Sequence, residues 1–303
     1  MKKVTFSIVG YDPKTGDFGV AVQSKFICVG AIVSHAEADI GAIATQAHAN
    51  TNYGPRGLEL LKTGKSAQEV INHLISDDEQ RESRQVAVIN GKGAAAHTGK
   101  DCFEWAGHIV GNNYSCQGNI LTGEETIQEM AKAFETTNGE LAVKLLAALL
   151  AADKEGLGDV RGKQSAALLV VRDKGGYGGY TDRLVDIRVD EHVEPIKELV
   201  RIYEIYDMVF LSNEDPSRLL TIEDTIAETI KQVLTELNYL KPEKASPASK
   251  WGEVERQALE AWVGINNFEN KWRDDGKIWQ SIYDYIKKEK GTPFIDIKRM
   301  SEK

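Results

Sequence analysis

Cysteine is scarce in this chain. The 303 residues include three, Cys28, Cys102 and Cys116. The number is odd, and their spacing fits neither a disulfide framework nor a zinc site. We therefore expect free thiols buried in the core, where an unpaired cysteine behaves as a small apolar side chain. No residue near Cys28 in the sequence supports it as a nucleophile.

Long apolar runs and an excess of positive charge are missing too. No stretch approaches the ~18 to 20 apolar residues of a membrane span. The segment Val4–Val9, which follows two lysines, is too short and too polar for a secretory signal. The net charge of −9 and the lack of a basic run argue against nucleic acid as a partner. These absences predict a cytoplasmic protein that binds neither membrane nor nucleic acid.

The densest group of polar side chains lies in residues 40–57, IGAIATQAHANTNYGPRG. An apolar run gives way there to Thr45, Gln46, His48, Asn52, Tyr53 and Arg56. In layered α/β folds, strand ends that lead into helices collect binding groups. The segment therefore fits the wall of a polar pocket. It also fits a turn that caps the following helix, because Asn, Thr and Gly-Pro are ordinary loop residues.

The order of periodic segments indicates the fold. Strands are predicted at residues 5–9, 18–22, 28–33, 40–44, 85–89, 94–98, 114–121, 165–171 and 183–189. Helices are predicted at residues 58–62, 66–75, 124–134, 141–152 and 195–210. Hairpins with helices in pairs do not suit a doubly wound parallel sheet. The prediction is an α+β fold, a four-layer αββα sandwich in which two antiparallel sheets face each other and a helix pair covers each.

The sequence Ser212-Asn-Glu-Asp-Pro216 is rich in residues that interrupt helices and strands, and the composition of the chain changes there. Beyond it the chain is charged and helical, and four of the five tryptophans lie there. We expect a first domain over residues 1–212 and a small helical C-terminal domain over residues 220–303, which is large enough to fold.

Thr5 and Ser7 open the first predicted strand and are candidates for a nucleophilic hydroxyl. A hydroxyl at a free N-terminus can use its own α-amine as the base, because that amine titrates near ~8. Lys25, after the second strand, would lower the pKa of the nucleophile or hold an oxyanion. The alternative is structural, since threonine is a favoured strand residue.

Three further motifs leave alternatives open. Gln117-Gly-Asn119 would bind a ligand through two amides, or form a β-bulge. Asp159 and Arg161, in a glycine-rich loop, would pair with each other or clamp a substrate carboxylate. His35, Glu37 and Asp39 share one face of an extended strand, which suits a divalent metal but more often marks a charged strand edge. The sequence predicts a protein that uses neither a metal nor a cofactor.

Several segments resemble a known family, and they occur in its order over about residues 4–210. They are Thr5-Phe-Ser-Ile-Val9, Gly19-Val-Ala-Val-Gln-Ser-Lys25, Gly41-Ala-Ile-Ala-Thr-Gln46, Asn52-Tyr-Gly-Pro-Arg-Gly57, Gln117-Gly-Asn119, Asp159-x-Arg161-Gly and Tyr180-x-Asp182-Arg183. The family is the uncharacterised domain of unknown function 1028. The resemblance implies the αββα fold of the N-terminal nucleophile hydrolases. Residues 224–290, with Ala261-Trp-Val-Gly-Ile-Asn-Asn267, resemble a peptidoglycan-binding domain appended to this family.

The resemblance implies a hydrolase of a small amide or related C–N bond, with Thr5 as nucleophile and Lys25 assisting. The residues expected to bind substrate are Ser7, Ser24, Thr45, Gln46, His48, Asn52, Tyr53, Arg56, Gln117, Asn119, Asp159 and Arg161. Four residues precede Thr5, whereas such a nucleophile must be residue one. The alternative is a catalytically silent binding protein whose tail binds cell-wall fragments or mediates assembly. The expected partners are a small-molecule substrate, a peptidoglycan fragment and further copies of the chain in a homo-oligomer.

Overall fold

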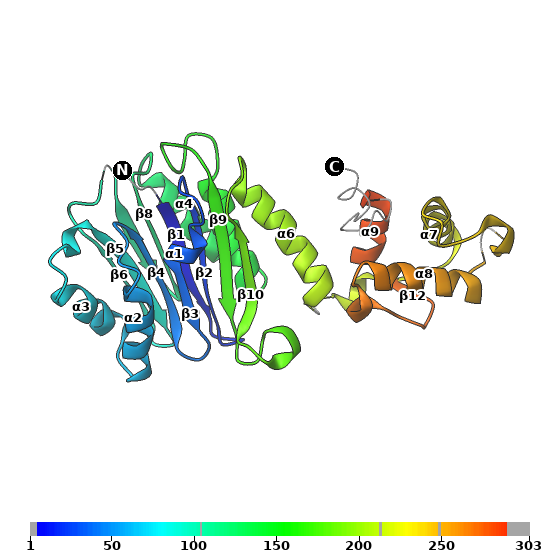
Figure 1. Ribbon diagram of the computed structural model, residues 1–303, viewed down its shortest axis with the longest axis horizontal. Coiled ribbons are helices and arrows are strands. Elements are labelled where there is room, and N and C mark those ends of the chain that lie inside the picture. Colours follow the sequence, from blue (N-terminus) through cyan, green and yellow to red (C-terminus); the bar gives the residue numbers. More distant parts are fainter. Residues whose placement is uncertain (1–4, 104, 212–213, 248–249, 290–303) are drawn as a thin grey trace. The chain divides into compact units, whose positions relative to one another are not determined.

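The computed structural model describes residues 5–103, 105–211, 214–247 and 250–289 (Figure 1). The chain divides into two compact units, residues 1–202 and 203–303. In the described part of the chain, no helix combines the length and the apolar character that crossing a bilayer demands.

The larger sheet of the N-terminal unit has six antiparallel strands in the order β10-β9-β2-β1-β8-β7. They are β1 (Thr5–Asp12), β2 (Asp17–Ser24), β7 (Gly107–Gly111), β8 (Tyr114–Asn119), β9 (Ser165–Val171) and β10 (Arg183–Val189). Strand β1 lies in the middle, between β2 and β8. Its first residue, Thr5, is therefore paired with Ser24 on one side and with Asn119 on the other.

The smaller sheet has four antiparallel strands in the order β3-β4-β5-β6. They are β3 (Ser34–Glu37), β4 (Gly41–Ala47), β5 (Arg84–Asn90) and β6 (Gly93–Thr98). Its inner face packs on the larger sheet, because Ala42 and Ala44 share one buried cluster with Val20 and Val22. Side chains alternate along a strand, so Gln46 continues this inward series and Thr45 points to the outer face.

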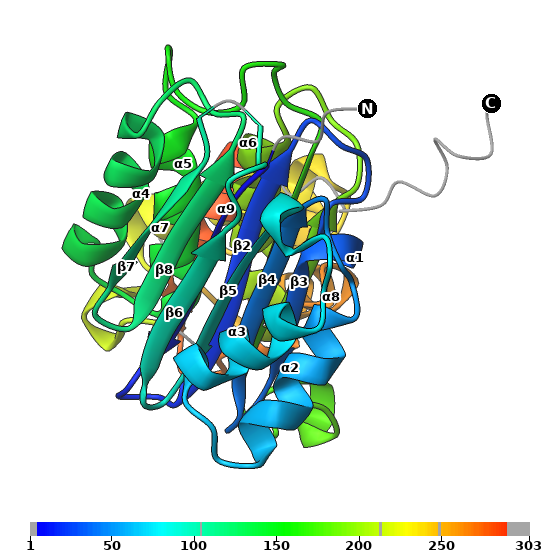
Figure 2. The ribbon, with the colours of Figure 1, turned by 90° about the vertical axis from the view of Figure 1, so that its left-hand side faces the viewer.

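A pair of helices covers the outer face of each sheet. On the smaller sheet lie α2 (Tyr53–Lys62) and α3 (Ala67–Ser76), in front of the strands in Figure 2. A capping box formed by Ser66 and Glu69 begins α3. On the larger sheet lie α4 (Glu125–Thr136) and α5 (Leu141–Ala152). Here Gly19 permits close packing, because a Cβ at that position would lie 2.6 Å from Leu145.

Helix α6 (Pro195–Phe210) runs across the division between the two units. The C-terminal unit continues with α7 (Asp224–Glu236), α8 (Glu253–Ile265), α9 (Gln280–Glu289) and a short strand pair, β11 (Leu219–Thr221) with β12 (Lys277–Trp279). Its core centres on Trp262 and Phe268, which are fully buried. Single 3-10 turns occur at Arg81–Ser83, Tyr177–Gly179, Pro216–Arg218, Pro242–Lys244 and Glu269–Lys271.

The predicted α+β class, with antiparallel sheets and a helical C-terminal part, is confirmed by these elements. The strand predicted at residues 28–33 is wrong: the chain forms a turn and the short helix α1 (Gly30–Val33). The carbonyl of Val29 accepts hydrogen bonds from the amides of Ile32 and Val33, and Gly30 lets this turn pack tightly on Ala167. Strand β7 was not predicted. The predicted domain boundary at 212–220 lies beyond the division at 202–203, because Met208 and Val209 at the end of α6 pack on the C-terminal core.

Candidate functional site

A cluster of amide and hydroxyl side chains is buried between the two sheets at the Thr5 end of β1. Its members, called the buried amide cluster below, are Ser7, Gln46, Gln85, Gln117 and Asn119. Each is at most 1% exposed. Inward-pointing polar residues of four strands meet here, so the cluster joins the two sheets where apolar packing would otherwise be expected.

The cluster is held by hydrogen bonds between side chains. Ser7 donates to Gln46 Oε1 over 2.6 Å and accepts from Gln117 Nε2 over 2.7 Å. The Oε1 atom of Gln85 accepts from Gln46 Nε2 at 2.7 Å and from Asn119 Nδ2 at 3.0 Å. A buried polar network with this much mutual bonding fixes the geometry of its members. None of the five side chains is titratable near neutral pH, so the cluster itself supplies no acid or base.

Thr5 lies beside this cluster and is 4% exposed. Its hydroxyl is 3.0 Å from the hydroxyl of Ser24, and its carbonyl accepts a 3.4 Å bond from Gln46 Nε2. Asn119 Nδ2 lies 3.5 Å from the same carbonyl, while its Oδ1 is buried with no partner in the described structure. The predicted residues Ser7, Ser24, Gln46, Gln117 and Asn119 are therefore brought together around Thr5.

Strained backbone surrounds the same end of the sheets. Cys28, Ala47 and Ile120 have φ angles of 55°, 62° and 53°, in the left-handed region. A β-branched residue such as Ile120 rarely adopts this conformation. Each case costs on the order of 1–3 kcal/mol, and such residues gather at functional sites. Ala47 directly follows Gln46 and Ile120 directly follows Asn119, so the strain sits next to two members of the cluster.

Lys25, Asp159 and Arg161 form a clasp outside the cluster. Lys25 was expected to assist Thr5, but its ammonium is exposed and donates to the Lys163 carbonyl at 3.0 Å. The hydroxyl of Thr5 bonds instead to that of Ser24. The carboxylate of Asp159 accepts the backbone amides of Lys25 and Arg161 at 2.9 and 2.8 Å. Burial raises the pKa of Asp159 although these bonds oppose the rise. This clasp holds the 156–163 loop against the end of β2, and Asp159 pairs with Arg161, one of the two predicted alternatives.

The other predicted site residues of the 40–57 segment do not join the cluster around Thr5, which corrects the prediction that the polar side chains of this segment form one pocket wall. Thr45 bonds to the Asn50 carbonyl at 3.2 Å, and Tyr53 is buried beneath α2. The other three, His48, Asn52 and Arg56, are exposed. The reason is the alternation along β4, which sends Thr45 and Gln46 to opposite faces.

Tyr53 and Arg56 instead line a hollow of about 380 Å³ outside the smaller sheet. Asp78 is its centre, accepting from the Tyr53 hydroxyl at 2.7 Å and from Arg84 Nε at 3.0 Å. Burial alone would raise the pKa of Asp78, but hydrogen bonds from Arg84, Tyr53, Asn50 and the Gln80 amide outweigh it and hold the pKa well below its usual range. The carboxylate of Asp78 is thus occupied by hydrogen bonds from neighbouring side chains, which is typical of a structural network.

The suggested metal ligands do not converge. His35 packs its ring on Gly54 of α2, Glu37 pairs with Lys62 at 2.8 Å, and Asp39 lies in the turn after β3. Among the residues that the structure describes, no group of three or more His, Cys, Asp or Glu side chains could hold a metal ion. Of the thiols, Cys116 is buried and Cys28 and Cys102 are half-buried.

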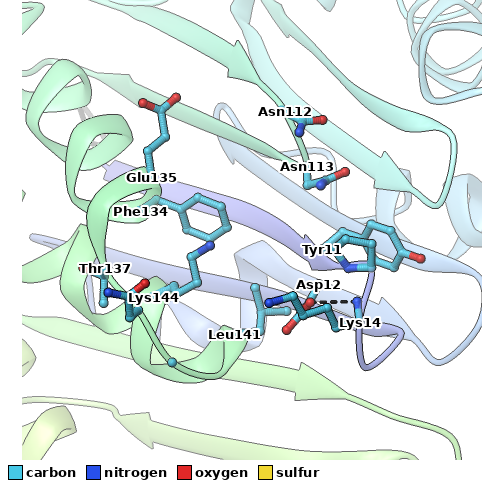
Figure 3. A pocket seen from close by; sticks show the side chains of 13 residues that line it. Tyr11, Asp12, Lys14, Asn112, Asn113, Phe134, Glu135, Thr137, Leu141 and Lys144 are labelled. Carbon is cyan, nitrogen blue, oxygen red and sulfur yellow. Dashed lines mark hydrogen bonds between the residues drawn. The ribbon is translucent and has the colours of Figure 1, made fainter.

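A larger cavity, of about 500 Å³, lies at the opposite end of β1 (Figure 3). Thr5 and Asp12 are the two ends of that strand, so about 23 Å of extended chain separates this cavity from Thr5. Phe134 forms part of its wall, and the ammonium of Lys144 lies 4.5 Å from the centre of that ring. None of the predicted site residues lines it.

Gln85 is the member of the cluster that the sequence does not indicate as a site residue, although it lies on a predicted strand. Its Nε2 lies within bonding distance of the carbonyls of Gly107 and Gly118, at 3.1 and 2.8 Å, so it ties β5 to the larger sheet. The available signal was a glutamine at the start of an otherwise apolar strand, Gln85-Val-Ala-Val-Ile89.

Comparison with known proteins identifies the class of the N-terminal unit. Residues 5–199 match the model of the family of unknown function DUF1028, and the chain belongs to that family. Residues 209–286 match the model described as "Putative peptidoglycan binding domain". The chain is also similar to protein SPO2555 from Silicibacter pomeroyi, a DUF1028 protein with a crystal structure. Identity is 30%, the TM-score is 0.62, and the match covers 69% of this chain and 92% of that one. No curated protein matches the chain.

These matches confirm the predicted family and the predicted kind of C-terminal domain. The assignments of catalytic and substrate-binding residues, the homo-oligomer and the cytoplasmic location stay predictions.

Proposed function

We propose that the N-terminal unit is a hydrolase of a small amide or related C–N bond, with Thr5 as the nucleophile once it is the first residue. One observation carries the proposal: Thr5 lines a small cavity and adjoins the buried amide cluster, and no side chain of that cluster could act as a base for its hydroxyl. While residues 1–4 precede Thr5, its nitrogen is an amide and cannot accept a proton. Removal of those residues would create the missing base at the right atom.

The reaction then follows from the groups present. The freed amine of Thr5, with an ordinary pKa of about 8, takes the proton of the Thr5 hydroxyl. The hydroxyl oxygen bonds to the substrate carbonyl carbon, and the C–N bond breaks as the amine returns the proton to the leaving nitrogen. Water then hydrolyses the ester by the same route in reverse order. The hydroxyl of Ser24 would orient that of Thr5, and the unpartnered Oδ1 of Asn119 would accept a bond from the new amine.

The arrangement of layers supports this reading. Helix pair, sheet, sheet and helix pair follow one another, as the four-layer sandwich of the N-terminal nucleophile hydrolases requires, and Thr5 begins a central strand. The strained residues Ala47 and Ile120 beside the cluster add support, because strain of this kind is kept where geometry matters.

The test uses the full chain made behind a fusion partner whose protease cuts directly before Thr5. We expect this Thr5-initiated chain to hydrolyse members of a panel of small amides, and the Met1-initiated chain to do so far more slowly. Thr5→Ser should keep turnover and Thr5→Ala should abolish it. The activity should rise with pH through a single ionisation near 8, that of the amine. No turnover by the Thr5-initiated chain, or equal turnover by its Thr5→Ala variant, would refute the proposal.

A second candidate function concerns the C-terminal unit, and the match of residues 209–286 to a peptidoglycan-binding model favours it. We infer that this unit binds peptidoglycan fragments. The full chain should co-sediment with purified peptidoglycan but not with cellulose, and soluble muropeptides should release it. Hydrogen exchange should slow within residues 209–286 on binding. Equal sedimentation with both polymers would count against the idea.

A further inference from the structure

A small cavity adjoins Thr5 on the side of α1. Its walls are Thr5, Gln46 and six apolar residues, Phe26, Val29, Ile32, Val33, Ala47 and Ala49. Its volume is about 20 Å³. That is close to the minimum space that holds one water molecule, so a single methyl-sized group would fill it.

The chemistry of the walls favours an apolar occupant over water. A buried water needs two to four polar partners. The polar walls here are Thr5 and Gln46, and both are engaged: the Thr5 hydroxyl with Ser24, and Gln46 Nε2 with Gln85 Oε1 at 2.7 Å. A methyl group needs no partner and would gain contacts with the six apolar side chains.

Two walls of the cavity are held in place by tight packing and hydrogen bonding. Val29 and Val33 are each 2% exposed, and the backbone amide of Val29 is bonded to Ser165 Oγ at 3.0 Å. Gly30, between them, sits against Ala167, where a Cβ would come within 2.4 Å. On the other wall Ala47 is held in its left-handed conformation. Because packed side chains resist displacement, a larger group would have to push this wall apart at a cost in stability.

We propose that this cavity is the acyl subsite of the N-terminal unit and that it takes a methyl-sized group. The favoured substrates are then acetyl amides, and branched acyl groups are rejected. The inference rests on the proposed function, because it places the scissile carbonyl beside the Thr5 hydroxyl. In an apolar pocket each surplus methylene is discriminated by about 10–200-fold.

The first experiment measures kcat/KM of the Thr5-initiated full chain on acetyl, propionyl, isobutyryl and isovaleryl amides of one amine. We expect the acetyl compound to exceed the isovaleryl compound at least tenfold. Val33→Ala should shift the optimum toward the longer acyl groups. The matched control is Val88→Ala, which removes the same two methyl groups from the outer core beneath α2 and α3 and should leave the preference unchanged.

The second experiment does not need turnover. Methyl signals of Ala47, Ala49 and Val33 are followed by NMR as acetamide or isovaleramide is added to millimolar concentration. We expect acetamide alone to shift them. If no amide is hydrolysed but acetamide shifts these methyls selectively, the subsite stands and the proposed hydrolase function fails.

If amides are hydrolysed with no preference for the short acyl groups, the hydrolase function stands and the subsite is refuted. If neither amide shifts the methyls, the subsite is also refuted.

Discussion

Gln85 and Gln23 allow one substitution to be made in two environments that differ in hydrogen bonding. Both glutamines lie on strands of the N-terminal unit, and both are at most 1% exposed. The Oε1 and Nε2 atoms of Gln85 bond to both sheets, whereas Nε2 of Gln23 has no partner in the described structure. Replacing each by leucine removes a buried amide of the same size at the same depth.

The expected loss of stability can be worked out from the contacts. Gln85→Leu leaves three buried groups without this partner: the Gly118 carbonyl and the side-chain amides of Gln46 and Asn119. A buried group left unsatisfied costs about 1–3 kcal/mol. Taking the low end for each, because Gln46 and Asn119 keep weaker contacts to Thr5, the free energy of unfolding should fall by at least about 3 kcal/mol. The unfolded fraction then rises by more than about a hundredfold.

Gln23→Leu removes an amide nitrogen that already lacks a bond, so we expect a loss below about 1 kcal/mol, or a small gain. The measurement is urea unfolding of the full chain, read by hydrogen exchange of peptides from β1, β5 and β8. That readout is confined to the N-terminal unit, which matters because two units need not unfold together. Similar losses for the two variants would show that the buried amide cluster contributes no more than any buried glutamine.

Three further outcomes are expected. Arg172→Ala removes the two 2.7 Å bonds to Asp17, which is 1% exposed, and should lower the free energy of unfolding by about 1–3 kcal/mol in urea titrations, because the 35% exposure of the Arg172 side chain lets solvent screen the pair; an unchanged free energy would contradict this. Burial lowers the pKa of His35 in the folded protein. The contribution of the neutral ring to the free energy of unfolding should therefore be constant above about pH 6.5, and it should be lost as the pH falls from there through the lower pKa of the folded state. His35→Gln should flatten that part of the stability curve, and an unchanged curve would argue against it. Glu255→Gln weakens charge-assisted bonds to Ser246 and should cost about 1–2 kcal/mol in the C-terminal unit, measured by the fluorescence of its tryptophans; an unaltered midpoint would contradict the reasoning.

The elements with a clear apolar pattern could be predicted closely. The bounds of β9, β10, α5 and α6 agree with the segments expected from sequence. β9 and α5 are continuous apolar runs, whereas apolar and charged residues alternate along β10 and α6 has the spacing of an amphipathic helix, and each pattern has clear ends. The Cys28–Val33 segment failed because its β-branched residues favour a strand, while packing around Gly30 imposes a helical turn.

The site was harder to predict because the direction of side chains depends on register. In Gly41-Ala-Ile-Ala-Thr-Gln46 every residue is small, apolar or uncharged, so the sequence does not indicate which alternate set faces the other sheet. A shift by one residue would exchange Thr45 and Gln46 between the faces. Gln85 was missed for the same reason, since its importance arises only when β5 is placed against β8.

The left-handed conformation of Ala47 has a consequence for attempts to stabilise this protein. Glycine adopts that conformation freely, so Ala47→Gly would relieve strain on the order of 1 kcal/mol while removing one small methyl group. A search guided by thermal stability alone would therefore accept this change. The same change would loosen the turn that follows Gln46 and widen the cavity beside Thr5. Selection for a higher melting temperature would therefore favour glycine at position 47, whereas selection for acyl-group specificity would retain alanine.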